Sequence, residues 1–96
     1  MRPSPLSEVE VSTRIAAVPR WKEQNGEITR TFEFKDFKTA LAFVNKVGDL
    51  AEKAGHHPDI DIRYNKVRLA LVTHDAGGLT GKDFDVAAEI DGAAGA

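Results

Sequence analysis

A long amphipathic helical pattern in the middle of the chain separates two regions that alternate with a period of two residues. From Asp36 to Gly55, apolar residues recur at intervals of three and four, which predicts one long helix. Asp36 stands in the N-cap position, and Gly55 followed by Pro58 predicts the end of the helix. Strand-like alternation on both sides of a single helix predicts a sheet against which that helix packs.

The first alternating region predicts a β-hairpin. Two strand-like runs, residues 21–24 and 28–34, flank Asn25-Gly26, the dipeptide that two-residue hairpin turns favour most. One face of the second run is apolar except at Arg30. We expect the Arg30 stem to lie on the sheet and its guanidinium to reach solvent.

The second alternating region, residues 59–72, predicts another hairpin with Asn65-Lys66 as its turn. If these two residues form the turn, the cross-strand register places His57 opposite His74 at the open end of the hairpin. Their Cβ atoms would then lie about 4.5–5.5 Å apart. A three-residue turn would break this pairing.

Two further helices complete the predicted order of elements. Ser7 can cap a helix from Glu8 to about Val18, and a glycine-containing loop leads to a last helix from about Lys82 to Ile90. The order is α-β-β-α-β-β-α, which predicts the α+β class: a four-stranded antiparallel sheet with three helices on one face.

The length of the chain restricts it to a single domain. Ninety-six residues leave no room for a second core, so we expect one domain over residues 1–96, with flexible ends at 1–6 and 92–96. The start resembles no secretory signal, and no apolar run approaches the 18 or so residues of a membrane span. We therefore expect a cytoplasmic protein that does not bind membranes.

Composition narrows the chemistry that is available. Lysine and arginine number 13 and acidic residues 15, a net charge of −2, so we expect no nucleic-acid partner. The absence of cysteine excludes disulfides, thiolate metal sites and cysteine nucleophiles. Only His56, His57 and His74 remain as side chains that ordinarily titrate near neutral pH.

Structural interpretations of these residues stay open beside a catalytic one. The pair His56-His57 can bond the free carbonyls at a helix end. Glu52 stands four residues before His56, so its carboxylate can reach that ring if the helix continues. A zinc site is a further alternative, although adjacent histidines chelate one ion poorly. Asp83, three residues after Thr80, fits a helix capping box.

One set of residues indicates a function more specifically than these periodic patterns do. The run Glu52-Lys53-Ala54-Gly55-His56-His57-Pro58, followed at fixed spacing by Tyr64, His74 and Asp83, resembles the signature of the pterin-4a-carbinolamine dehydratases. The likeness covers most of the chain, from Pro19-x-Trp21 to the loop before Asp83, and leaves out the two ends.

The resemblance implies a fold, a reaction and an assembly. Family members have an antiparallel four-stranded sheet with three helices on one side, and they form dimers or tetramers by pairing sheet edges and helices. Their reaction removes water from a 4a-hydroxytetrahydropterin to give a quinonoid dihydropterin, which recycles the tetrahydrobiopterin of aromatic amino acid hydroxylases. The resemblance implies no metal and no cofactor, since the pterin is the substrate.

The resemblance also implies roles for individual residues. His56 would donate a proton to the leaving hydroxyl, His74 would assist in proton transfer, and His57 would bind or polarise the pterin. Glu52 would orient His56, Trp21 would line the pocket, and Asp83 would hold the site in shape. Pro58 of the motif is a further substrate-binding or supporting residue.

A second function class remains as the alternative. The same fold also serves as a binding or assembly module, either without catalysis or in addition to it. A relative freed from catalysis has no reason to keep Glu52 and all three histidines at this spacing, and this chain has all four.

Overall fold

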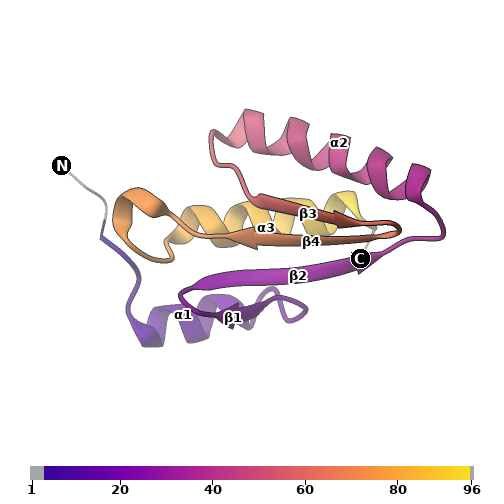
Figure 1. The fold of residues 1–96 in the computed structure, drawn as a ribbon. Helices are drawn as coiled ribbons and strands as arrows, with labels where there is room; N and C mark the ends of the chain where they lie inside the picture. Colours follow the sequence, from indigo (N-terminus) through magenta and orange to yellow (C-terminus); the bar gives the residue numbers. More distant parts are fainter. Residues whose placement is uncertain (1–3, 96) are drawn as a thin grey trace.

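The computed structural model describes residues 4–95 and has the predicted α+β architecture (Figure 1). A short 3-10 helix, η1, is the one element that the sequence did not predict. In chain order the elements are α1 (Glu8–Ile15), β1 (Lys22–Gln24), β2 (Glu27–Glu33), α2 (Phe37–Ala54), β3 (Asp59–Arg63), β4 (Lys66–Leu71), η1 (His74–Ala76) and α3 (Gly81–Ala93).

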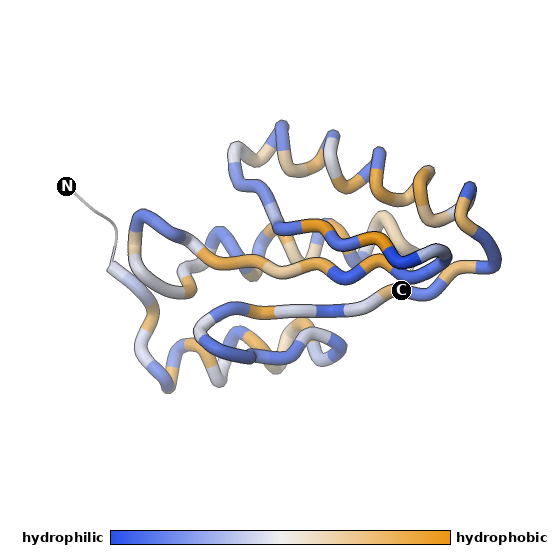
Figure 2. Tube along the Cα trace, in the orientation of Figure 1, coloured by the Kyte–Doolittle hydropathy of each residue, from blue (hydrophilic) through white to orange (hydrophobic). Residues whose placement is uncertain are grey.

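The four strands form one antiparallel sheet in the order β1-β2-β4-β3. In Figure 1, α1 and α3 lie behind this sheet, and α2 runs along β3. The apolar side chains of the two central strands are buried, and in Figure 2 much of the β4 trace is orange, the colour of hydrophobic residues. The buried side chains are Ile28, Phe32, Val67, Leu69 and Leu71.

The first hairpin follows the prediction. Gln24 pairs with Glu27, so Asn25-Gly26 forms the two-residue turn. Both turn residues have positive φ, 54° and 81°, which is the backbone of a type I′ turn. Asparagine and glycine reach this backbone most readily, and local sequence therefore fixes this register.

The second hairpin turns one residue earlier than predicted. Arg63 pairs with Lys66, so the turn is Tyr64-Asn65 and the predicted turn at Asn65-Lys66 is wrong. A tertiary contact holds the turn here. The side-chain amide of Asn65 donates to the Phe34 carbonyl at 2.7 Å, and the backbone carbonyl of Asn65 accepts the Phe34 amide at 2.9 Å. Each cross-strand pair shifts by two residues, so the apolar face is preserved. The predicted pairing of His57 with His74 is lost.

Helix α2 begins and ends where its sequence predicts. The Asp36 carboxylate accepts hydrogen bonds from both the hydroxyl and the amide of Thr39, at 2.6 Å and 2.8 Å. These bonds, the hydroxyl's first, lower the pKa of Asp36 below its ordinary value. At the other end Gly55 adopts φ 65°, the left-handed conformation that ends the helix.

The lowered pKa of Asp36 gives an expected pH dependence. The cap stabilises α2 fully above the aspartate pKa of the unfolded chain, about 3.9, and this stabilisation is lost as pH falls through the lower folded pKa. Asp36→Asn keeps a capping side chain but does not titrate. We expect thermal melts between pH 2 and 5 to depend less on pH in this variant. A pH dependence equal to that of the wild type would contradict this role.

Both ends of the chain include residues that make hydrogen bonds or belong to a helix. Leu6 donates its amide to the Leu79 carbonyl at 2.7 Å, and α3 continues to Ala93. Helix α1 is shorter than predicted and ends at Ile15. Residues 1–3 and 96 of the predicted flexible ends lie outside the described residues. None of the helices in residues 4–95 combines the length and the hydropathy that crossing a bilayer requires.

The prediction that the guanidinium of Arg30 reaches solvent is wrong. Its guanidinium donates to Asp91 at 2.6 Å and lies 4.0 Å from the centre of the Phe32 ring. Its side chain is only 10% exposed. The charge on the apolar face of β2 is therefore neutralised by a carboxylate near the end of α3.

Candidate functional site

The three histidines line one open hollow of about 290 Å³. The hollow lies where α2 ends, where the chain leaves β4, and where α3 begins. It is therefore assembled from three separate segments of the chain. The residues that line it are Gly55, His56, His57, Val72, Thr73, His74, Asp75 and Lys82.

The end of α2 determines where the first two histidines lie. Gly55 donates its amide to the Glu52 carbonyl at 3.3 Å, and His56 donates its amide to the Ala51 carbonyl at 3.1 Å. These two bonds are the Schellman motif, which reverses the chain after a left-handed glycine. As a result, the His56 ring points toward α3 and the His57 ring lies against the last turn of α2.

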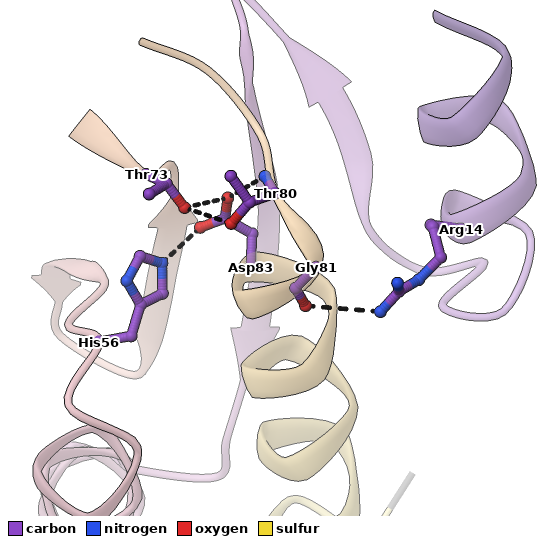
Figure 3. A network of polar contacts seen from close by, with 6 residues as sticks. All are labelled: Arg14, His56, Thr73, Thr80, Gly81 and Asp83. Carbon is purple, nitrogen blue, oxygen red and sulfur yellow. Dashed lines mark hydrogen bonds and ion pairs between the residues drawn. The ribbon is translucent and has the colours of Figure 1, made fainter. Parts of the chain in front are cut away.

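His56 is held by a buried carboxylate (Figure 3). Its Nε2 lies 2.5 Å from Oδ1 of Asp83, and the two side chains are 12% and 0% exposed. The other oxygen of Asp83 accepts the Thr73 hydroxyl and the Thr80 amide, each at 2.9 Å. An ionised carboxylate accepts hydrogen bonds only, and these contacts occupy both of its oxygens.

His57 has a different and more exposed partner. Its Nε2 lies 2.5 Å from Oε2 of Glu52, and the two side chains are 59% and 78% exposed. The expectation that Glu52 orients His56 is therefore wrong, because the chain reverses at Gly55 and the helix does not continue to His56. Asp83 takes the place that Glu52 was expected to have.

His74 lies at the first position of η1, directly after Thr73. Backbone hydrogen bonds fix this turn, since Ala76 donates to the Thr73 carbonyl and Gly77 to the His74 carbonyl, both at 3.0 Å. The hollow thus contains three imidazoles in three settings. One is partly buried and paired, one is exposed and paired, and one is carried on a short helix.

None of the four predicted supporting residues lines the hollow: Glu52 and Asp83 contact its histidines from outside, and Trp21 and Pro58 make neither of these contacts. Trp21 is 2% exposed and donates its indole N–H to Asp91 at 2.8 Å. Asp91 is eight residues beyond Asp83 on α3, about 12 Å along the helix axis, so Trp21 belongs to the opposite end of α3. Pro58 joins His57 to β3, and it is partly buried.

The hollow also contains residues that the sequence did not single out. The contact of Thr73 with Asp83 could not be predicted, because a threonine before a histidine carries no sequence signal for such a bond. Lys82 lines the hollow with its cationic side chain, and no sequence signal identified it. Thr80 was visible as the first residue of the capping box with Asp83.

A zinc site is one of the alternatives that the sequence leaves open for these histidines. Within residues 4–95, no group of three or more histidine and acidic side chains is arranged to hold a metal ion. Two of the histidines instead direct a ring nitrogen at a carboxylate oxygen. This arrangement suits the orientation of imidazole rings for proton transfer.

Comparison with known proteins identifies one family. The family model described as pterin 4 alpha carbinolamine dehydratase matches residues 4–93. Relatives that bear the name of this family occur in Acidobacterium capsulatum and Chloroflexus aurantiacus, and each is 63% identical to the chain over 86 residues. These alignments cover 90% of this chain and 94% and 92% of the two relatives.

Solved structures agree with these relatives. A crystal structure described as a transcriptional coactivator/pterin dehydratase from Brucella melitensis superposes with a TM-score of 0.90 at 35% identity and covers 95% of this chain and 99% of that one. A pterin dehydratase-like protein identified as a RuBisCO assembly factor superposes at 0.65 with 24% identity, covering 80% of this chain and 89% of that one. The second likeness extends to the fold alone.

Proposed function

The chain belongs to the pterin 4 alpha carbinolamine dehydratase family, and on this basis we propose that it is an enzyme that removes water from 4a-hydroxytetrahydropterins. The observation that carries the proposal is the single hollow lined by His56, His57 and His74. The product is a quinonoid dihydropterin, and its formation would serve the recycling of the tetrahydropterin used by aromatic amino acid hydroxylases.

The reaction is an elimination that needs one proton delivered and one removed. The bond between C4a and the hydroxyl oxygen breaks while the N5 lone pair forms a double bond to C4a. The hydroxyl leaves as water after taking a proton, and N5 loses its hydrogen. Imidazoles suit both transfers because their ordinary pKa of about 6.5 lets them carry or accept a proton near neutral pH.

The settings of the histidines favour a division of these tasks. His56 is the best-fixed ring, so in our proposal its doubly protonated form, with Nε2 bonded to Asp83, protonates the leaving hydroxyl from Nδ1. His74, which lines the same hollow, takes the proton from N5. His57 is the most exposed of the paired rings and binds or polarises the pterin. Exchange of protons with solvent then restores the starting state.

The proposed reaction requires no redox cofactor, because loss of water changes no oxidation state, and the proposal assigns both proton transfers to histidines instead of to a metal ion. The test is the rate at which purified protein converts a synthetic 4a-hydroxytetrahydropterin, followed by the absorbance of the quinonoid product. We expect conversion well above the spontaneous rate and unchanged by EDTA. Conversion at the spontaneous rate would refute the proposed function.

We further propose that the enzyme is a homo-oligomer joined through an exposed apolar surface. Four large side chains of α2, β3 and the following turn are 37–67% exposed; we call them the α2–β3 surface: Phe37, Leu41, Ile60 and Tyr64. β3 is also an edge strand. Antiparallel pairing of two copies centred on Ile62 places Asp61 of one opposite Arg63 of the other, which favours a second copy as the occupant.

Leu41→Glu tests this assembly. A carboxylate in an apolar interface is expected to shift the protein to monomers, measured by light scattering after gel filtration. Val9→Glu is the matched control, because Val9 is 76% exposed on α1 and lies outside the α2–β3 surface. If both variants keep the mass of the wild type, the surface does not join copies of the chain.

A further inference from the structure

We infer that Thr73 is a positioning residue for His56, acting through Asp83. Its hydroxyl holds the carboxylate in the orientation that turns Nε2 of His56 toward the interior and leaves Nδ1 for the hollow. This inference rests on the proposed function, since it concerns how the proton donor is set in place. It adds a residue with no direct role in proton transfer to the machinery of the site.

With Asp83 ionised, the hydrogen-bond inventory of the network allows one arrangement of hydrogens. The Thr73 hydroxyl has one hydrogen, which it donates to Oδ2 of Asp83 at 2.9 Å. The Thr80 hydroxyl, 2.7 Å from that of Thr73, must then be the donor to the Thr73 oxygen. The Thr80 amide also donates to Oδ2. Every hydrogen on this side of the network therefore points toward the carboxylate.

The remaining oxygen of Asp83 then fixes the tautomer of His56. An ionised carboxylate only accepts, so Nε2, 2.5 Å from Oδ1, must carry a hydrogen. Nδ1 is left as the nitrogen that exchanges a proton with substrate. Rotation of the Asp83 carboxylate would break this bond, and the donors on Oδ2 oppose that rotation.

The Thr73 hydroxyl bonds to Asp83 and does not cap its own helix. It is the N-cap residue of η1, where a threonine hydroxyl normally bonds an amide of its own helix. Here it makes no such bond and contacts Asp83 instead. Because Thr73 also precedes His74, one residue fixes both the backbone that carries His74 and the carboxylate that holds His56.

Thr73→Val tests the inference with little change in side-chain shape. Valine removes the donor to Oδ2 and the acceptor of the Thr80 hydroxyl, while Thr73→Ser retains both. Thr29→Val is the matched control, since Thr29 is 8% exposed but lies in β2, outside the hollow. The readouts are kcat and KM across pH and the ¹⁵N chemical shifts of the His56 ring, which report the tautomer without any need for activity.

We expect Thr73→Val to lower kcat about tenfold with little change in KM, because misorientation of a catalytic group slows the chemical step. Thr73→Ser and Thr29→Val should stay near the wild type. In wild-type protein the ¹⁵N shifts should show hydrogen on Nε2 of neutral His56, and in Thr73→Val a mixture of tautomers. The combination of Thr73→Val with Asp83→Asn should be no slower than Asp83→Asn alone.

Folded Thr73→Val with the kcat and the His56 shifts of the wild type would overturn the inference. An equal loss in Thr29→Val would also overturn it, because the effect would then follow from any buried hydroxyl. If the wild-type protein shows no dehydratase activity, the proposed function fails, and the ¹⁵N shifts still decide whether Thr73 sets the tautomer.

Discussion

Replacing His56 with alanine is expected to lower kcat/KM for the 4a-carbinolamine by about 10²–10⁴-fold, the usual contribution of a general acid. His56 is the ring that the fold fixes most firmly, since its side chain is 12% exposed and its Nε2 is held by Asp83. Alanine removes the proton donor and leaves the rest of the hollow in place. The loss should appear mainly in kcat, because the missing interaction belongs to the transition state.

His57→Ala is the matched variant for this measurement. It removes an imidazole from the same hollow, but one that is 59% exposed and paired with an exposed Glu52. If His57 binds or polarises the pterin, its loss should raise KM and reduce kcat less than the loss of His56. A folded His56→Ala protein with wild-type kcat/KM would rule out His56 as the proton donor.

Replacing Asp83 with alanine is expected to lower the free energy of unfolding by about 3–5 kcal/mol, because donors left without an acceptor in the interior cost about 1–3 kcal/mol each. Asp83 is fully buried and receives the Thr73 hydroxyl, the Thr80 amide and His56. All three groups would lose their partner in the interior. The start of α3 would lose half of its capping box at the same time, because Asp83 accepts the Thr80 amide.

Urea denaturation followed by circular dichroism measures this effect. Asp85→Ala is the control, because Asp85 lies on the same helix and pairs with Arg14 in solvent, where its side chain is 74% exposed. An exposed pair of this kind contributes less than about 1 kcal/mol. If Asp83→Ala destabilised the protein no more than Asp85→Ala, Asp83 would not be the structural centre of the site.

Local chemistry made several elements predictable. Asn25-Gly26 fixes the first hairpin because its two residues adopt positive φ readily. Asp36 and Gly55 fix α2 because one supplies acceptors to the free amides and the other reverses the chain. In each case the residue that determines the backbone lies within the element or directly beside it.

The second hairpin could not be predicted in this way. Its turn depends on the bonds of Asn65 to the backbone of Phe34, which is 31 residues away in the sequence. That contact keeps Tyr64 at φ 53°, a conformation that tyrosine rarely adopts alone. A tertiary contact therefore overrides the local preference and shifts the register by two residues.

In the candidate site too, some features follow from local sequence and others depend on tertiary contacts. The histidines could be selected from the sequence because few other side chains titrate near neutral pH. Their partners could not, because the rule that residues four apart meet on a helix fails where Gly55 ends it. Glu52 accordingly pairs with His57, and His56 turns to Asp83, which belongs to another helix.

The most direct test of the account is the turnover of a protein in which His56, His57 and His74 are all alanine. The variant must first give the circular dichroism spectrum and the cooperative melt of the wild type. The account predicts that it converts the 4a-carbinolamine only at the spontaneous rate, with the wild type well above it. A folded triple variant that retained the wild-type rate would contradict the claim that these three imidazoles carry the chemistry.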